Sequence, residues 1–254
     1  MSQPDNSYPD LMMVDSQSIT GLQVSHFETG CAMLIDKPYG WSSFRVVGLL
    51  RKLLGIKKIG HAGTLDPMAT GLLIVCIGKT ATRQIHHYQG AVKQYRAEIT
   101  FGASTPSYDK ETLPDHWCDK DHIDIDTIRN TLESQFLGVI QQVPPMYSAI
   151  KKGGVALYKL ARKGRQVERD PRSVEIFQTQ VHSYNPPELD LSITCSKGTY
   201  IRSLANDLGL ALNSCAHLSA LRRTAIGPFH VDDSVTVQNL ISHLDPDGKL
   251  GISL

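Results

Sequence analysis

The sequence predicts an α+β protein built around one large mixed sheet. Runs with strand character outnumber segments with helical spacing, the two kinds are mixed along the chain, and no internal repeat or low-complexity tract interrupts them. The 254 residues are enough to bury a full core, and 41% hydrophobic residues is the composition of an ordinary soluble globular protein.

The N-terminal part begins with a polar stretch, residues 1–30, that predicts a flexible leader. The run CAMLI at 31–35 then predicts a strand, and residues 41–55 predict a helix that begins at Ser42 or Ser43 and ends at Gly55. Helical spacing places four apolar side chains on one face of this helix: Phe44, Val47, Leu50 and Leu54. The apolar run 72–78 has the length and branched residues of a fully buried strand.

The rest of the chain continues the mixture. Residues 93–102 alternate and predict a half-buried strand with Tyr95, Ala97, Ile99 and Phe101 on one face. Residues 104–126 form an acidic loop. We expect helices at 127–137 and 198–213, and strands at 174–181 and 189–195.

Charge and cysteine usage narrow the class of protein. The formal net charge is +1, so any binding of nucleic acid must come from local patches. No apolar run is long enough to span a membrane, and the first cation is Lys37, so no targeting signal is expected and the location is cytoplasmic. Five scattered cysteines are expected to be reduced, buried thiols.

The stretch GHAGTLDPMATG, residues 60–71, surrounds one carboxylate, Asp66, with glycines and small residues. Pro67 restricts Asp66 to an extended conformation, and the glycines let the backbone approach a ligand closely. An ionised Asp can act as a nucleophile or as an electrostatic stabiliser. The local alternative is a turn-forming Asp that only bonds neighbouring amides.

Three further side chains have a functional and a structural interpretation. Arg202 lies in the first turn of a predicted helix, where a cation opposes the helix dipole, so it should meet an anion such as Asp66 or a phosphate; the alternative is a solvated side chain. Tyr95 can stack on a nucleobase or pack in the core. His61 can contact a nucleobase or simply be exposed.

Residues 143–172 carry eight cations against two acids, with Tyr147 and Tyr158 interleaved. This pattern indicates a mobile RNA-gripping segment, and the alternative is a solvated face.

Six segments in order resemble the TruB-type tRNA pseudouridine-55 synthases: LIDKPYGWSSF, KIGHAGTLDPMATGLL, KQYRAEITFGASTPSYD, VPPMYSAIKKGGVALYKLARKG, GTYIRSLANDLG and LSALRRTAIGPF. They cover roughly residues 31–229. The resemblance implies a pseudouridine synthase fold, with a mixed, mostly antiparallel central sheet, flanking helices and an inserted RNA-binding thumb.

The resemblance also implies roles. Asp66 matches the aspartate that attacks the target uridine, Tyr95 the tyrosine that stacks on the flipped base, and Arg202 the arginine that pairs with the aspartate. Lys37 and Pro38 match the motif that supports the active-site floor, and Leu221 lies in the block that lines the pocket. The residues expected to bind RNA are His61, Lys37, Asp109, Lys151, Lys152, Tyr158, Lys159, Arg162 and Leu221.

The implied partner is the T arm of tRNA, read by a monomer without guide RNA, membrane, metal or cofactor. The implied organisation is a catalytic domain at 31–230 with a thumb at about 141–172, and a short tail at 231–254 in place of a C-terminal RNA-binding module of the PUA type. Whether Asp66 attacks C1′ or C6 of the uridine, or deprotonates the sugar, stays open.

Two other functions are compatible with the residues. The first is a module that binds and reshapes tRNA without catalysis. The second is a nucleoside glycosidase, which normally requires a second carboxylate beside the bond, and the candidate for it in the matching segments is Asp109.

Overall fold

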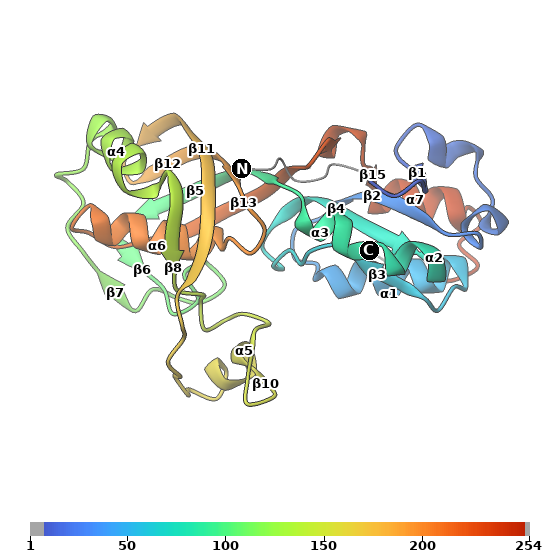
Figure 1. Cartoon of the computed structure of the whole chain (residues 1–254), viewed down its shortest axis with the longest axis horizontal. Helices are drawn as coiled ribbons and strands as arrows, with labels where there is room; N and C mark the ends of the chain where they lie inside the picture. The colour runs from blue at the N-terminus through green and yellow to red at the C-terminus, as the bar shows by residue number, and fades with distance from the viewer. Residues whose placement is uncertain (1–7, 252–254) are drawn as a thin grey trace. The chain divides into compact units, whose positions relative to one another are not determined.

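The computed structural model describes residues 8–251 and divides into two compact units (Figure 1). The first unit contains the residues up to Gln94 together with those from Arg222 onward, and the second contains Tyr95–Leu221. Two strands, β5 (Lys93–Phe101) and β13 (Ala216–Ile226), carry the chain from one unit to the other.

The first unit is organised around β2 (Cys31–Lys37) and β4 (Thr70–Ile77), which pair antiparallel. The strand order is β1-β2-β4-β13, with β1 (Met12–Val14) parallel to β2 and β13 parallel to β4 at Arg222 and Arg223. Three short strands complete this sheet: β3 (Ile59–His61) on β4, β14 (Phe229–His230) on β13, and β15 (Val235–Thr236) on β2.

Alternate residues of β2 and β4 face opposite sides of the sheet, and each side has its own core. Met33, Ile35, Leu73 and Val75 pack in one cluster with α1 (Ser43–Leu54) and α7 (Val237–Leu244). The intervening residues Leu34, Leu72 and Ile74 pack in a second cluster with residues of α2 (Gly78–Arg83) and α3 (Ile85–Gly90). The fully buried strand predicted at 72–78 is therefore confirmed.

Helix α1 begins and ends as its sequence predicts. The Ser42 side chain accepts a hydrogen bond from the Arg45 amide, and Gly55 closes the helix at φ 69°. The predicted buried face is wrong at one position, because Phe44 is 72% exposed while Val47, Leu50 and Leu54 are buried. Phe44 lies in the first turn and contacts the ring of His61 instead of the core.

Both ends of the chain are more ordered than predicted. A flexible leader at 1–30 is wrong for residues 8–30, because β1 pairs with β2, and Val14, Ile19 and Phe27 are buried; residues 1–7 lie outside the described part. A tail beginning at 231 is also wrong, since β15 pairs with β2 and α7 places Val237 and Leu240 in the core. Short helical turns at Ser18–Gly21, Val24–Phe27 and Val231–Asp233 belong to these ends.

The second unit has the strand order β13-β5-β12-β11-β8, in which β12 (Glu188–Cys195) and β8 (Gly138–Gln142) both pair antiparallel with β11 (Arg172–Asn185). The alternation predicted for β5 is confirmed, with Ala97, Ile99 and Phe101 buried and Tyr95 half-buried. Its helices are α4 (Ile125–Thr131), continued by a π turn at Leu132–Phe136, and α6 (Ile201–Ala211).

The segment expected to be a thumb lies between β8 and β11. It holds β9 (Lys151–Lys152), β10 (Val155–Ala156) and α5 (Leu157–Ala161), which form a small lobe of this unit in Figure 1. Leu157 is its buried anchor, and the basic side chains around it are exposed.

The prediction that all five cysteines are free is wrong for two of them. Cys118 and Cys215 form a disulfide, while Cys31, Cys76 and Cys195 are buried. The pair meets because Gly102 bonds to both partners: its carbonyl accepts from the Cys118 amide at 3.0 Å, and its amide donates to the Cys215 carbonyl at 2.8 Å. Cys118 follows a hairpin of β6 (Ala103–Ser104) and β7 (His116–Trp117) that sequence periodicity does not reveal.

Replacing Cys118 by Ser tests this link. The bond joins residues 97 positions apart, and closing so long a loop restricts the unfolded chain by roughly 4 kcal/mol. We expect Cys118→Ser to lower the thermal midpoint by roughly 5–15 °C without reductant. With dithiothreitol present, the variant and the wild type should unfold together. A wild-type midpoint that is insensitive to reductant would show that the link contributes nothing.

Candidate active site

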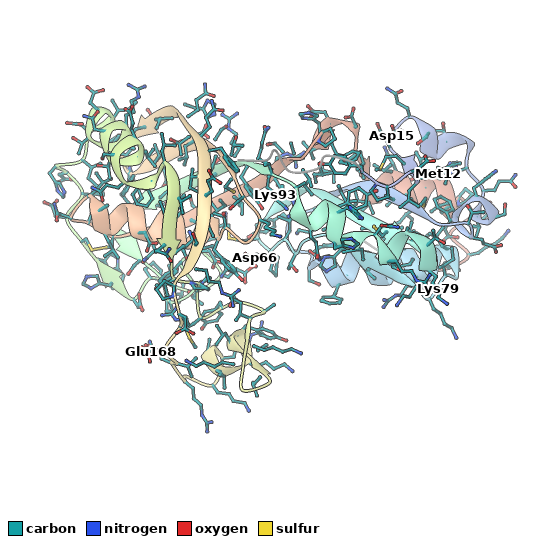
Figure 2. All side chains as sticks on the ribbon, viewed as in Figure 1. Met12, Asp15, Asp66, Lys79, Lys93 and Glu168 are labelled. Carbon is teal, nitrogen blue, oxygen red and sulfur yellow. A yellow bond between two sulfur atoms is a disulfide. The ribbon has the colours of Figure 1, made fainter. Side chains whose placement is uncertain are left out.

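Asp66 lies in the loop between β3 and β4, residues 62–69, called here the Asp66 loop (Figure 2). The residue before it is fixed by Ser43, whose hydroxyl accepts from the Leu65 amide at 2.9 Å and donates to the Leu65 carbonyl at 3.2 Å. Ser43 is 1% exposed, so water does not compete for these bonds. Because Ser42 caps α1, Ser43 is left free for this second role.

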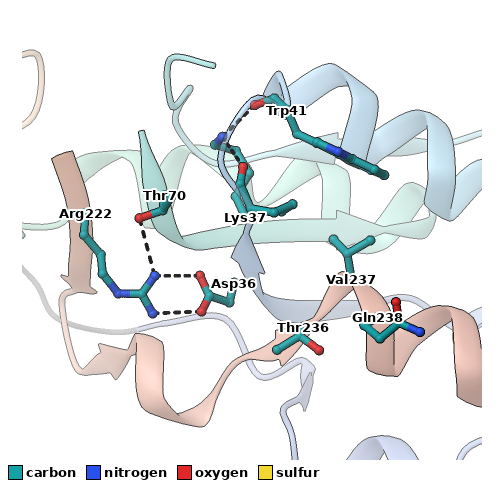
Figure 3. A pocket seen from close by; sticks show the side chains of 9 residues that line it. Asp36, Lys37, Trp41, Thr70, Arg222, Thr236, Val237 and Gln238 are labelled. Carbon is teal, nitrogen blue, oxygen red and sulfur yellow. Dashed lines mark hydrogen bonds and ion pairs between the residues drawn. The ribbon is translucent and has the colours of Figure 1, made fainter. Parts of the chain in front are cut away.

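The residue after Asp66 is fixed as well. The Pro67 carbonyl accepts from the Gly40 amide at 2.8 Å and from Lys37 Nζ at 3.4 Å. The Lys37 ammonium also donates to the carbonyls of Pro38 and Trp41, the latter at 2.6 Å (Figure 3). Lys37 is fully buried. This position suits the supporting role that the resemblance implies for it. It also means that the Lys37 ammonium does not contact a phosphate directly in this conformation.

Arg223 fixes the two glycine-rich ends of the Asp66 loop. Its guanidinium donates to the carbonyls of Gly63 at 3.1 Å and Leu72 at 2.8 Å, and the residue is 1% exposed. Gly71 has φ +100°, and a Cβ there would lie 2.3 Å from the Arg223 carbonyl oxygen. Only glycine allows this approach of backbone to backbone. The loop that carries Asp66 is therefore held at both ends and on both sides of the carboxylate.

His61 ends β3 and lies directly before the Asp66 loop. Its ring meets the Phe44 ring edge to face, with centroids 5.4 Å apart and planes at 84°. Burial, and then the charge of Arg223, lower the pKa of His61, and a backbone hydrogen bond to Gly63 opposes the shift. The imidazole is therefore neutral at pH 7 and offers an apolar face with hydrogen-bonding edges.

Arg202, in the first turn of α6, lies beside a carboxylate that the sequence analysis did not name for it, that of Asp109. Its Nε lies 3.5 Å from an Asp109 carboxylate oxygen, and both side chains are almost completely buried. Its two terminal nitrogens donate to the carbonyls of Ser107 at 3.2 Å and Tyr147 at 2.9 Å. Arg202 is thus held by the 104–126 loop and by the beginning of the thumb.

Asp109 is itself fixed by its own loop. One carboxylate oxygen accepts from the Ser107 hydroxyl and from the Glu111 amide. The backbone on either side of Asp109 pairs with Leu218 of β13, at 3.0 Å from the Tyr108 carbonyl and 3.2 Å from the Lys110 amide. At 1% exposure Asp109 is not available to RNA in this conformation, and its geometry is that of a residue that positions Arg202.

The remaining predicted residues divide between the sheet and the thumb. Tyr95 is half-buried in β5, and Leu221 is 8% exposed in β13. The exposed cations of the thumb include Lys151, Lys152, Lys159 and Arg162. The Arg162 guanidinium lies 5.7 Å from the centre of the half-buried Tyr158 ring, and Lys152 donates to the backbone carbonyl of Glu168.

A cavity of about 380 Å³ adjoins the DKP motif in the first unit (Figure 3). It is lined by Asp36, Trp41, Arg222 and the beginning of α7. Arg222 makes a bidentate pair with Asp36 at 2.8 and 3.0 Å, so these two charges neutralise each other. Lys37 also lines the cavity and leaves its wall with an excess of positive charge.

Among residues 8–251, one cluster has the spacing of metal ligands: His116, Cys118 and Cys215. Both sulfurs are engaged in the disulfide, which leaves no thiolate for a metal. No helix in this part of the chain is long and apolar enough to cross a bilayer.

Sequence reasoning missed three residues that build the site: Ser43, Arg223 and Ser107. The role of Ser43 could have been inferred from the sequence. WSSF contains two serines, and because a helix needs only one N-cap residue, the second serine is available for another contact. Arg223 donates to the backbone carbonyls of Gly63 and Leu72, and the backbone carbonyl of Ser107 accepts from Arg202. Both contacts join segments far apart in the sequence, and no local pattern marks them.

Comparison with known proteins places this geometry in context. A model described as the N-terminal domain of the TruB family pseudouridylate synthases matches residues 51–201, and one described as the C-terminal domain of tRNA pseudouridylate synthase B matches residues 202–246. The protein named tRNA pseudouridine synthase B in Flavobacterium johnsoniae is 48% identical over 215 residues, covering 82% of this chain and 93% of that protein. Its namesake in Phocaeicola vulgatus is 43% identical over 226 residues, covering 87% and 95%.

Among solved structures, a chain from a Cbf5–Nop10–Gar1 complex superimposes with a TM-score of 0.68 and 29% identity. The alignment covers all of this chain and 63% of that one, so the chain spans less than two thirds of that neighbour.

The depressed pKa of His61 predicts a pH effect on stability. An unfolded His61 takes up a proton near its usual pKa of about 6.5, whereas the folded residue resists it. Acidification from pH 7.5 to 5.5 should therefore reduce the free energy of unfolding, and His61→Gln should remove that part of the loss. His122, whose pKa the Leu212 carbonyl raises, contributes in the opposite direction in both proteins. Urea unfolding at the two pH values measures the difference, and equal losses would contradict the prediction.

Proposed function

The chain belongs to the TruB family of pseudouridylate synthases, and we propose that it converts uridine 55 in the T arm of tRNA to pseudouridine. The observation that carries the proposal is the fixed backbone at Asp66, since hydrogen bonds hold the residues on both sides of it, Leu65 and Pro67. Relatives that align over more than nine tenths of their length bear the name of this tRNA enzyme.

The reaction breaks the C1′–N1 bond of the uridine, turns the base and joins C1′ to C5. Substrate and product are isomers, so the reaction consumes no external oxidant, reductant or energy source. Asp66 acts as nucleophile at C1′ or C6, or as the base that removes a proton from the sugar. Each route needs an ionised carboxylate at a fixed point beside the flipped base, and the rigid loop supplies that fixed point.

The other residues prepare the substrate. The target base must leave its stack, which costs a few kcal/mol. Stacking on Tyr95 offsets part of that cost, worth about 1–3 kcal/mol per base. The thumb cations Lys151, Lys152, Lys159 and Arg162 contact phosphates, and Tyr158 stands among them. Leu221 lines the wall of the base pocket.

Arg202 supplies a positive charge to the bound substrate. Asp109 positions Arg202, since a buried guanidinium with no anion would be strongly destabilising. His61 contacts the remodelled T loop through its neutral ring. Lys37 supports the Asp66 loop by donating a hydrogen bond to the Pro67 carbonyl.

We further propose that the protein works as a monomer in the cytoplasm and recognises tRNA without a guide RNA. The curated relatives are named as tRNA enzymes, whereas the Cbf5 neighbours come from multi-subunit complexes, one of them an H/ACA RNP bound to a substrate RNA. Each of the two curated relatives aligns with this chain over almost its full length, which supports an enzyme that acts without partner subunits and without a guide RNA.

The test is tritium release from unmodified tRNA labelled at uracil C5, because C5 exchanges its hydrogen for the new bond to C1′. Wild type should release tritium only from the T-arm uridine. Asp66→Asn should bind the tRNA with a dissociation constant within about threefold of wild type and turn over about 10⁴-fold more slowly or worse. Asp126→Asn, an exposed acid of α4, is the matched control and should behave as wild type.

Normal turnover by Asp66→Asn would contradict the assignment of the carboxylate. Tight tRNA binding by wild type without any release would favour the binding-module alternative. Free uracil among the products would favour the glycosidase.

A further inference from the structure

Phe44 occupies a position that packing does not explain. Helical periodicity places it on the face of α1 that carries Val47 and Leu50, and both of these are buried, yet Phe44 is 72% exposed. An isolated exposed apolar residue needs no explanation. Phe44 is not isolated, however, because its ring contacts a second ring, that of His61, at 5.4 Å and 84°.

These two perpendicular rings, called here the aromatic corner, are fixed to the loop that carries Asp66. Phe44 directly follows Ser43, and the Ser43 hydroxyl bonds to Leu65, the residue before Asp66. His61 directly precedes the first residue of the same loop. The corner and the carboxylate therefore belong to one hydrogen-bonded assembly, separated by few residues on either side.

The charge around the corner favours a polyanion. The first turn of α1 has no acidic residue, so the positive end of its dipole is not opposed. The exposed Arg45 follows Phe44, and its guanidinium lies 3.8 Å from the centre of the Trp41 ring. Trp41 is only 8% exposed, so the ring that this surface offers is that of Phe44. An exposed aromatic ring beside an arginine can bind an unpaired nucleotide by stacking and phosphate contact.

We propose that Phe44 is a base-stacking residue, and that the aromatic corner of Phe44 and His61 holds an unpaired nucleobase adjacent to the target uridine. A base lying on the Phe44 ring presents its edge to the His61 ring, since the two rings are nearly perpendicular. This inference rests on the proposed function for the identity of the RNA, and adds a contact to a neighbour of the reacting nucleotide.

The first measurement is the dissociation constant of an unmodified T-arm hairpin, in an Asp66→Asn background so that the RNA is not converted. Phe44→Ala removes the ring on which one base stacks, so its dissociation constant for the hairpin should be roughly 5- to 150-fold higher than that of the parent. Phe44→Trp should bind within about threefold of the parent, because it keeps a π face, and Phe44→Leu should bind nearly as poorly as Phe44→Ala. Phe177→Ala is the matched control, since Phe177 is also an exposed phenylalanine, at 46%, and should leave binding unchanged.

The second measurement locates the base. Hairpins with 2-aminopurine at single unpaired T-loop positions report stacking as fluorescence quenching. At a position next to the target, the Phe44 parent should quench the probe and Phe44→Ala should not. In the free protein, the His61 ring proton signals should shift in Phe44→Ala, which confirms the edge-to-face contact and the fold of the variant without RNA.

Binding by Phe44→Ala within twofold of the parent, or equal binding by Phe44→Leu and Phe44, overturns the inference. These experiments distinguish a failure of the stacking role of Phe44 from a failure of the proposed isomerisation. If wild type releases tritium from the T arm but Phe44→Ala binds normally, only the aromatic corner is wrong. If wild type binds the hairpin through Phe44 but releases no tritium, the proposed isomerisation is wrong and the stacking role stands.

Discussion

The hydroxyl of one buried serine organises the Asp66 loop of the first unit. Ser43 bonds to both polar backbone groups of Leu65, and Gly40 with Lys37 holds Pro67, so the intervening Asp66 has little backbone freedom. A glycine-rich loop would otherwise lose much conformational entropy on ordering. Here its buried hydrogen bonds, completed by Arg223, offset that loss and leave a carboxylate at a defined point.

The second unit solves a related problem for a cation. A buried guanidinium is stable only with an anion and with acceptors for its protons, and Arg202 finds them in Asp109, Ser107 and Tyr147. The loop that supplies Asp109 and Ser107 is closed by the Cys118–Cys215 disulfide and by backbone bonds to Leu218. Each unit thus fixes one charged residue by fixing a loop, and the thumb adds exposed positive charge.

Local rules predicted the fold class well, because the elements that define it carry their own signals. The alternation of β5, the apolar run of β4 and the caps of α1 are all properties of short windows, and the family comparisons confirm the pseudouridine synthase fold. The ends were mispredicted because β1 and β15 are only three and two residues long and are stabilised by pairing with β2. A strand that short has no periodicity to detect.

The motif residues of the candidate site could be named from the sequence, whereas the contacts that hold them could not. Asp66 and Arg202 stand in distinctive segments, while the Arg202–Asp109 pair joins residues 93 positions apart and depends on where two loops fold. Phe44 shows the limit of helical periodicity, which assigns a face but does not say whether the first turn of a helix meets the core. Where such a pattern fails beside a candidate active site, function is a better explanation than packing.

The most direct test is a rapid-quench measurement of a single turnover by Ser43→Ala, with tRNA bound to saturation. It asks whether the two hydrogen bonds between the Ser43 hydroxyl and the Leu65 backbone make Asp66 reactive. We expect the chemical step to be at least about 10-fold slower than in wild type, because a carboxylate displaced by about 1 Å loses its alignment. The dissociation constant for tRNA should stay close to that of wild type, and the variant should remain folded. A single-turnover rate equal to that of wild type would show that the two hydrogen bonds of Ser43 do not control the reactivity of Asp66.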